Sequence, residues 1–382
     1  MRVTHVLNRL NFLDGGPPRG VVDLCEAVRD RGHDVSLITT DVNDVPSSWS
    51  DSISVLKVNP PDRPLGFFSK SNLDAAVGLV SSSDVVHFHG VWERLNHQLA
   101  SACRRSGTPY VMTLRGMLDD WSMEQGGWYK RLFLKLYGQK YLDCASCIQC
   151  TAHGELRQSS KWFPQTKTAV IPNLMDLSAF RDAPSCNEAK EHFGEKLDGI
   201  SLLFLSRIHE KKGLEYLIEA MPKIQTELGT CNLIIAGDGH PGYIEKLKIL
   251  AEQTGVSRHI HWVGHVGGAL KYSLFQASDL FVLPSSQENF GFVLFESMVC
   301  GTPVLVSELV DTAEDIERSG GGSRIPQCPL AIADMVVNLS LDTERRRVMS
   351  QKGREWVLKH LDGKDVAVRV EKMYAEALFH SD

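Results

Sequence analysis

The stretch 281–308, FVLPSSQENFGFVLFESMVCGTPVLVSE, has the pattern of a buried strand, a polar loop, a helix and a second strand. The loop carries Glu288 and Gly291, and the helix carries Glu296. Such units build parallel sheets. Gly291 lets the backbone approach a ligand, and the following helix N-terminus offers free N–H groups to a phosphate. On spacing alone, however, a solvated loop glutamate and a surface helix glutamate are the more common explanation.

Strand-like and helix-like segments alternate along the whole chain. RVTHVLN and DVVHFHG are strand-like runs of the first half, and ISLLFLSR and CNLIIAGDG are strand-like runs of the second. Two such series without a short repeat predict an α/β protein with two Rossmann-like domains of parallel sheet. We expect residues 1–173, with a C-terminal helix at about 364–382, to form one domain and residues 174–363 the other. Because ligands bind at the carboxyl ends of parallel strands, two facing domains predict a central cleft.

The composition is that of a globular protein. Of 382 residues, 43% are hydrophobic and 23% are charged, which excludes a disordered chain. The net charge of -6 argues against a partner nucleic acid, which would require a basic face. The sequence has no apolar run of the ~18 residues that a membrane span needs. It has no secretory pattern at the N-terminus, so we expect a cytoplasmic protein.

The nine cysteines are scattered, and without an export signal we expect free thiols. Cys144, Cys147 and Cys150 are each separated by two residues, a spacing that suits zinc or an iron–sulfur cluster. No fourth ligand is evident nearby, and CASCIQCTA has the character of a short buried strand. We therefore expect core cysteines and no metal here.

Two cations follow the strand-like run ISLLFLSR. Arg207 ends this run, and Lys212 lies directly before Gly213 and a helix-like segment. Two cations at the carboxyl end of a strand, beside a helix N-terminus, suit a diphosphate. A pair of exposed, solvated cations is the alternative.

The order of these segments resembles the C-terminal domain of the family 4 (group 1) glycosyltransferases, which have the GT-B fold. The matching segments are LSRIHEKKG, IIAGDG and WVGHV, followed by the stretch 281–308. Within that stretch, Glu288 and Glu296 form an E-x(7)-E motif, and Cys-Gly-Thr-Pro-Val follows.

The first half shows the resemblance too. Its matching features are the Gly15-Gly16 loop, the HFH run that ends at His89, and the linker VIPNLMD. The resemblance covers about residues 1 to 325. It implies two Rossmann-like domains that face a central cleft and close during turnover.

The resemblance implies a donor site in the second domain. Arg207 and Lys212 would neutralise the diphosphate leaving group. Glu288 would contact the hydroxyls of the donor sugar, and Glu296 would hold the ribose. Backbone groups would complete the contacts with the sugar and the base, at Asn289, Phe290, Gly291 and Val266.

In the first domain, the resemblance implies that Gly15 and Gly16 approach the phosphates and that His89 faces the acceptor. Two positions depart from the family's pattern. Arg115 stands where the family often has a histidine, which points to an anionic or differently shaped acceptor. The linker reads Asn-Leu where Asn-Gly is usual, a local change.

We therefore expect a retaining glycosyltransferase that uses a nucleoside diphosphate sugar, with UDP expected first from its frequency in the family. The acceptor would be a hydroxyl of a glycan, a lipid-linked sugar or a small molecule. No Asp-x-Asp motif suits a metal–diphosphate contact, so we expect no metal and no other cofactor. A GT-B-fold epimerase and a non-catalytic nucleotide-sugar-binding protein are the alternatives. A nicotinamide-dependent dehydrogenase fits less well, because DGGPPRG is not G-x-G-x-x-G.

The segment 126–144, GGWYKRLFLKLYGQKYLDC, predicts a basic amphipathic helix. Such a helix suits an anionic membrane surface, and would place the protein on the inner face of the membrane near a lipid-linked acceptor. A helix that packs on its own domain and leaves its lysines solvated is the more common arrangement.

Overall fold

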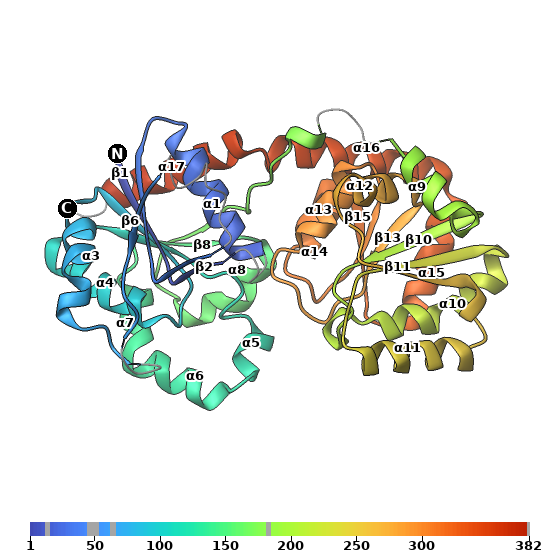
Figure 1. The fold of residues 1–382 in the computed structure, drawn as a ribbon, viewed down its shortest axis with the longest axis horizontal. Helices are drawn as coiled ribbons and strands as arrows, with labels where there is room; N and C mark the ends of the chain where they lie inside the picture. Colours follow the sequence, from blue (N-terminus) through green and yellow to red (C-terminus); the bar gives the residue numbers. More distant parts are fainter. Residues whose placement is uncertain (12–15, 44–52, 62–65, 181–184, 380–382) are drawn as a thin grey trace. The chain divides into compact units, whose positions relative to one another are not determined.

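The computed structural model describes residues 1–11, 16–43, 53–61, 66–180 and 185–379. The chain divides into two compact units (Figure 1). The first comprises Met1–Asp176 and Leu361–Asp382, and the second comprises Leu177–His360. Each unit is a parallel sheet covered by helices, which confirms the expected α/β class with two parallel-sheet domains.

A parallel sheet forms the centre of the first unit. Within the described residues its strands are β1 (Arg2–Leu7), β3 (Asp34–Thr39), β5 (Ser54–Lys57), β6 (Val85–His89), β7 (Tyr110–Thr113), β8 (Cys147–Cys150) and β9 (Thr168–Val170). Their order is β5-β3-β1-β6-β7-β8-β9. A separate small sheet pairs β2 (Arg9–Asn11) with β4 (Asp41–Asn43). β6 and β7 are buried along their whole length, as strands that helices cover on both faces must be.

Helices pack on both faces of this sheet. They are α1 (Gly16–Arg29), α3 (Lys70–Ser82), α4 (Arg94–Ser106), α5 (Asp120–Glu124), α6 (Gly127–Phe133), a π-helical turn (Leu134–Gly138), α7 (Gln139–Asp143), α8 (His153–Ser159) and α17 (Gly363–Phe379). Successive residues of β6 join different apolar clusters, Val85 with α1 and α17 and Val86 with α3, α4 and α7. Alternate residues of a strand point to opposite faces, so these clusters fill the two sides of the sheet.

The second unit has its own parallel sheet. Within the described residues its strands are β10 (Ile200–Leu205), β11 (Cys231–Ala236), β12 (Ile260–Gly264), β13 (Leu280–Leu283), β14 (Val304–Ser307) and β15 (Gly322–Ile325). Their order is β12-β11-β10-β13-β14-β15. The main helices are α9 (Asn187–Phe193), α10 (Leu214–Leu228), α11 (Pro241–Gln253), α12 (Gly268–Ala277), α13 (Phe292–Val299), α14 (Ala313–Ser319), α15 (Pro329–Leu341) and α16 (Thr343–His360).

Each sheet reverses its strand order once. The chain continues from β1 to β3 on one side and later crosses to β6 on the other, and β10 has the same relation to β11 and β13. At such a switch point the loops after the two central strands diverge and leave room for a ligand at their carboxyl ends. The topology therefore marks the ends of β1 and β6 in the first unit and of β10 and β13 in the second.

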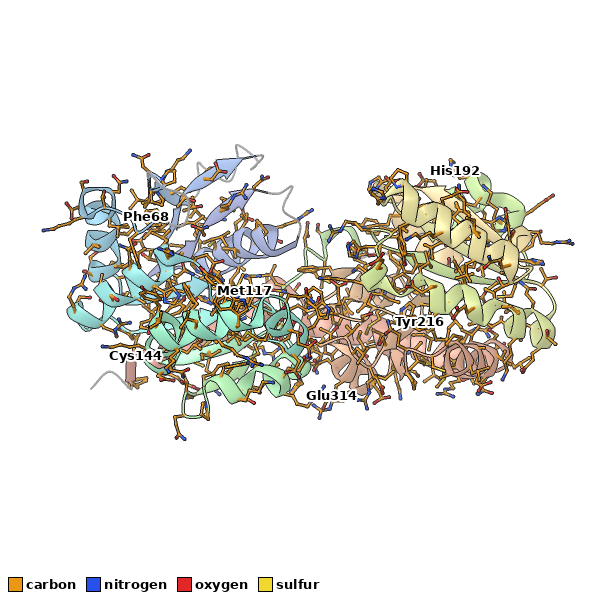
Figure 2. The ribbon with its side chains drawn as sticks, turned by 90° about the horizontal axis from the view of Figure 1, so that it is seen from below. Phe68, Met117, Cys144, His192, Tyr216 and Glu314 are labelled. Atoms are coloured by element: carbon orange, nitrogen blue, oxygen red, sulfur yellow. The ribbon has the colours of Figure 1, made fainter. Side chains whose placement is uncertain are left out.

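The three closely spaced cysteines lie in the first unit. Cys147 and Cys150 are buried in β8, whereas Cys144 is exposed after α7 (Figure 2). All three are free thiols, and this split between core and surface does not form a common metal site.

None of the described helices is both long and apolar enough to cross a membrane.

Candidate active site

At the switch point of the second unit, two loops meet through an ion pair. Lys212 follows β10, Glu288 follows β13, and the Lys212 ammonium contacts the Glu288 carboxylate. The side chains are 13% and 25% exposed, so the pair is partly shielded from water yet reachable. A cation and a carboxylate thus lie together at the carboxyl edge of the sheet.

The backbone around this pair is closely packed. Gly213 has φ +63°, and a Cβ atom there would lie 2.2 Å from the carbonyl oxygen of Pro284. The Gln327 side-chain amide donates to that carbonyl oxygen at 2.7 Å and to Ser286 Oγ at 2.9 Å. Only glycine fits this position without moving the loop after β13. The approach of the two loops is therefore fixed by backbone contact, not by the ion pair alone.

A second ion pair includes Glu296, the other glutamate of the E-x(7)-E motif. Lys271 of α12 donates to Glu296 of α13 at 2.8 Å, and both side chains are 19% exposed. The sequence pattern indicated Glu296 but not Lys271, which lies in an ordinary helical segment without a motif. Its position next to α13 is a product of tertiary packing.

The loop between β13 and α13 is held by the following segment. The Asn289 amide donates to Asp311 Oδ2 at 3.2 Å, and the Asp311 N–H donates to the Glu288 carbonyl at 3.0 Å. Thr312 Oγ1 donates to the carbonyl of Phe290, whose ring is buried. These bonds hold the backbone that carries Glu288 in one conformation.

Gly291 ends this loop with φ +66° and is the residue before α13. A Cβ atom there would lie 2.8 Å from Leu294 Cδ1 and 3.0 Å from Glu288 Cγ. A side chain would therefore displace Glu288 as well as strain the backbone.

The other residues expected at the donor site are more dispersed. Arg207 is exposed at the end of β10, and no ion pair involves it within the described residues. Val266 follows β12 and is buried. Gly15 lies outside the described residues, and Gly16 is the first residue of α1.

In the first unit, His89 lies inside the sheet and is 1% exposed. Its Nε2 is 3.0 Å from His5 Nδ1, and its Nδ1 is 3.3 Å from the guanidinium of Arg115. Both ring nitrogens of His89 are thus engaged by protein groups, and its expected contact with an acceptor stays a prediction. Its direct partner, Arg115, lies two residues after the end of β7.

His89 belongs to a series of side chains linked by hydrogen bonds, called here the histidine chain. Arg115 determines which group donates and which accepts in each of these bonds. A guanidinium can only donate, so His89 Nδ1 accepts and its Nε2–H donates to His5. His5 Nε2–H then points at the hydroxyl of Tyr374, at 3.5 Å the longest link. Arg115 therefore determines the tautomers of both rings.

The chain continues from Tyr374 across the sheet. Its hydroxyl is 2.7 Å from His87 Nδ1, and His87 Nε2 is 2.7 Å from Thr113 Oγ1. Thr113 donates to Gln149 Oε1 at 3.0 Å, and the Gln149 amide donates to the Ile171 carbonyl at 2.9 Å. The chain joins β1, β6, β7, β8 and α17.

His5, His87 and His89 also have ligand atoms within 4.8 Å of one another, a spacing that suits a metal ion. Burial first, and then Arg115, lowers the pKa of His5 to about 3, and burial lowers the pKa of the other two well below 6.5. The rings are therefore neutral. A metal ion bound here would disrupt the hydrogen bonds between the rings and would lie beside the positively charged guanidinium of Arg115. The geometry therefore favours a hydrogen-bonded network that supports the Arg115 side chain.

Arg115 has φ +56° and is the only described residue other than glycine with a positive φ. Its Nε is buried without a hydrogen-bond partner, and its guanidinium reaches Asn173 Oδ1 at 3.4 Å. The next residue, Gly116, donates its N–H to Glu155, a buried carboxyl that also accepts from the N–H of Thr151. Strain in a non-glycine residue that its surroundings hold in place is typical of functional positions.

A cavity of about 480 Å³ opens at the carboxyl ends of β1, β3 and β6. Its lining includes Glu93, Trp92, Arg94 and Lys130. Glu93 Oε2 has no hydrogen-bond partner, and burial raises the pKa of this carboxyl to about 7. Sequence reasoning did not identify Glu93. The visible signal was its place four residues after the strand that ends at His89.

Comparison with known proteins gives two family matches that together span most of the chain. A model described as "Glycosyl transferases group 1" matches residues 186–356. A model described as "Glycosyl transferase 4-like domain" matches residues 15–174.

Individual relatives extend over nearly the whole length. An uncharacterized glycosyltransferase of Methanocaldococcus jannaschii is 28% identical over 371 residues, which cover 93% of each chain. The phosphatidyl-myo-inositol mannosyltransferase of Mycolicibacterium smegmatis is 25% identical over 344 residues, which cover 85% of this chain and 80% of that one. The structure of Anabaena HepE with UDP and glucose matches with a TM-score of 0.73 and 17% identity, covering 98% of this chain and 99% of that one. The last comparison confirms the expected GT-B fold.

Proposed function

Because this chain belongs to the group 1 glycosyltransferases, we propose that it transfers a sugar from a nucleoside diphosphate to an acceptor hydroxyl with retention of anomeric configuration. The observation that carries this proposal is the Lys212–Glu288 pair at the switch point of the second unit. It puts a cation for a leaving phosphate beside a carboxylate for sugar hydroxyls, at the edge where parallel sheets bind ligands.

On the donor side, Lys212 and Arg207 neutralise the diphosphate as the bond to the sugar breaks. Glu288 accepts hydrogen bonds from the sugar, and Glu296 accepts them from the ribose, held in place by Lys271. Lys212 is paired with Glu288, and a bound diphosphate would offer the lysine a second anionic partner. Having an anionic partner at each stage would keep the lysine side chain oriented.

In the chemical step, the acceptor hydroxyl attacks the anomeric carbon from the face that the diphosphate leaves. The carbon–oxygen bond to the diphosphate breaks, and a phosphate oxygen takes the proton of the hydroxyl. No side chain becomes covalently attached to the sugar. Positioning and electrostatic stabilisation of the leaving group carry the catalysis.

On the acceptor side, we assign the hydroxyl-bearing substrate to the cavity that Glu93 lines. The Glu93 carboxyl has a pKa of about 7, and its Oε2, which has no hydrogen-bond partner, can accept a hydrogen bond from a hydroxyl group. Arg115 at the end of β7 suits an anionic group of the acceptor, because its buried Nε lacks a partner and its orientation is fixed by the histidine chain.

The proposal is tested by incubating the protein with UDP-, GDP-, ADP- and dTDP-sugars and measuring release of nucleoside diphosphate. We expect slow hydrolysis of one donor, with UDP-sugars first from their frequency in the family. GDP-mannose is the second choice, because a relative that is 27% identical over 212 residues is named as a GDP-mannose-dependent mannosyltransferase. Activity should persist in chelator, since the cations that neutralise the diphosphate are side chains. Binding of a donor without any hydrolysis or transfer would leave only a nucleotide-sugar-binding protein, and epimerised donor would indicate the epimerase.

A further inference from the structure

An apolar stripe lies exposed on the continuous helical segment that α6, the π-helical turn and α7 form. Trp128, Leu132 and Leu136 recur at every fourth position and are 76%, 45% and 61% exposed. No residue of α6 is buried. The segment attaches to its unit from the other side, through the buried Leu134 and Tyr141. The amphipathic helix thus turns its apolar stripe outward.

Two exposed rings extend this stripe towards α3. The rings of Phe67 and Tyr137 lie 5.8 Å apart, and they are 51% and 47% exposed. The guanidinium of Arg94 lies over the Phe67 ring at 4.7 Å. Exposed large apolar side chains scattered singly need no explanation, but a contiguous set points to a binding surface.

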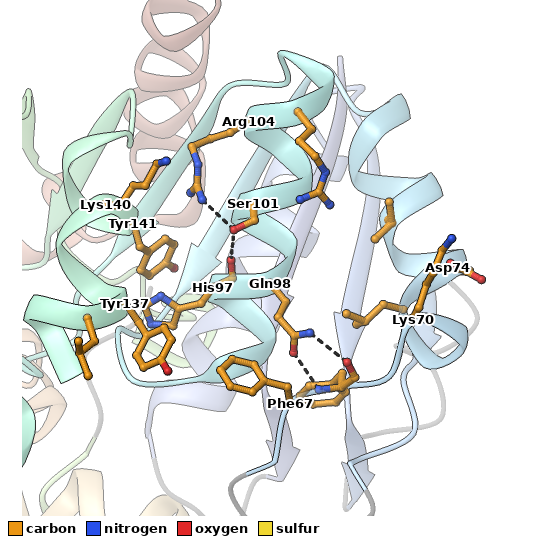
Figure 3. Close-up of a pocket in the computed structure, with 15 residues that line it drawn as sticks. Phe67, Lys70, Asp74, His97, Gln98, Ser101, Arg104, Tyr137, Lys140 and Tyr141 are labelled. Carbon is orange, nitrogen blue, oxygen red and sulfur yellow. Dashed lines mark hydrogen bonds between the residues drawn. The ribbon is translucent and has the colours of Figure 1, made fainter.

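A basic cavity of about 540 Å³ adjoins these rings (Figure 3). Phe67, Leu136 and Tyr137 belong to its lining, so it is continuous with the apolar stripe. Its cationic side chains come from α3, α4 and α7, and they are Lys70, Arg104, Arg105 and Lys140. One acidic residue, Asp74, is also part of the lining.

The cavity is structurally supported. Arg104 donates to Ser101 Oγ at 2.7 Å, and the Gln98 side chain bonds both the N–H and the carbonyl of Phe68 (Figure 3). These bonds hold the rim that carries Phe67 against α4. Lys140 and Arg105 are exposed, so their charges are available to a partner.

We propose that this surface, named here the basic aromatic face, binds an anionic lipid bilayer. It consists of Phe67, Trp128, Leu132, Leu136 and Tyr137 with the cavity cations Lys70, Arg104, Arg105 and Lys140, and we include Lys135, which is exposed on the same helical segment. The exposed rings and leucines enter the boundary between headgroups and acyl chains, and the basic cavity receives a lipid phosphate. Attachment is peripheral.

Charge favours a bilayer over a second copy of the chain. Two copies that met through this face would bring their cations together, whereas an anionic membrane surface complements every one of them. The combination of an apolar stripe with basic flanks is also the pattern by which helices lie in a membrane interface. The face does not depend on the proposed transfer reaction, so its test uses no enzymatic activity.

The test is flotation of the intact protein with vesicles of phosphatidylcholine alone or mixed with phosphatidylglycerol. We expect binding to the mixed vesicles, weakened by salt, and little binding to phosphatidylcholine alone. The variant Lys135→Glu with Lys140→Glu should reduce partitioning by about tenfold or more. Trp128→Ser with Leu136→Ser should also reduce it, and both variants should keep the wild-type thermal transition because these side chains are exposed.

Matched controls come from the second unit. Leu330 and Leu341 are 64% and 71% exposed, and Leu330→Ser with Leu341→Ser should leave flotation unchanged. Lys246→Glu with Lys248→Glu is the matching charge control on exposed residues of α11. Absence of flotation with the mixed vesicles would overturn the proposal. So would equal loss in the controls, or a dimer in light scattering that only the Trp128 and Leu136 replacements dissociate.

Discussion

The two units stabilise their functional groups by different physical means. In the second unit, Lys212–Glu288 and Lys271–Glu296 are charged pairs between loops and helices, each 13 to 25% exposed. In the first unit, Arg115 rests on a buried chain of neutral imidazole, phenol, hydroxyl and amide groups. One site relies on charges that can change partner, and the other on a network with fixed donors and acceptors.

The proposed function offers a reason for this difference. If Lys212 binds a diphosphate that arrives and leaves in every cycle, the cation needs an alternative anionic partner, and a partly hydrated carboxylate provides one. Arg115 needs a constant direction, and a buried neutral chain provides it because unpaired polar groups are costly there. The second unit should therefore tolerate losing a pair with little change in stability, while the first should not.

The largest effect is expected for Lys212→Ala. Removing one electrostatic donor to a developing charge costs on the order of 3 kcal/mol, so turnover should fall about a hundredfold or more. Stability should change little, because the pair is partly exposed. Initial rates of nucleoside diphosphate release with the donor found in the panel measure this, and urea unfolding checks the fold.

Lys248→Ala, at an exposed position of α11, is the control and should keep the wild-type rate. A well-folded Lys212→Ala variant with unchanged turnover would remove Lys212 from the donor site. The Lys212–Glu288 pair would then have no role in donor binding, and the physical difference between the two units would not reflect what they bind.

The same contrast explains what could be predicted from the sequence. Glu288, Gly291 and Glu296 lie in one contiguous stretch, so a local motif identified them together with the fold class. Lys271 was missed because a lysine in a helix carries no local signal.

The hydrogen-bond network of the first unit could not be predicted from the sequence, for a similar reason. His5 and Tyr374 lie at opposite ends of the chain and meet only after α17 packs on the first sheet. The sequence singled out His89 and Arg115 separately, but their contact and the burial of His89 depend on which strands become neighbours.

A second large effect is expected for Tyr374→Phe, this time on stability. Removing the hydroxyl leaves His87 Nδ1 and His5 Nε2 without their partner in the core. The cost of a buried unsatisfied group is about 1–3 kcal/mol, and urea unfolding should show a loss of this size. Tyr243→Phe is the control, since its hydroxyl donates to Glu215 at a partly exposed site and a smaller loss is expected. Equal losses in the two variants would argue against a special role of the buried chain.

Glu93→Gln should alter how stability depends on pH. Burial raises the pKa of Glu93 from 4.5 to about 7 in the folded protein, so between these values the folded state binds more protons than the unfolded state. The wild type therefore loses stability as pH rises through this window, and the glutamine variant does not. The free energy of unfolding of the variant minus that of the wild type should grow from pH 4.5 to 7 by on the order of 1–2 kcal/mol, a value discounted for the partial exposure of Glu93. Above pH 7 the difference should level off. Urea midpoints at several pH values measure it, and a pH-independent difference would mean that folding does not change the pKa of Glu93.

The smallest expected effect is the stability cost of the positive φ angle at residue 115. Arg115→Gly and Arg115→Ala both lose the guanidinium, but only alanine keeps a Cβ atom at φ +56°. Glycine should therefore be the more stable variant by about 0.5–1 kcal/mol, even though it has more freedom in the unfolded chain. At Lys248, inside the helix α11, the same comparison should have the opposite sign. Equal stability of Arg115→Gly and Arg115→Ala would mean that residue 115 leaves the positive-φ region once its guanidinium is lost, even though the N–H of Gly116 donates to Glu155.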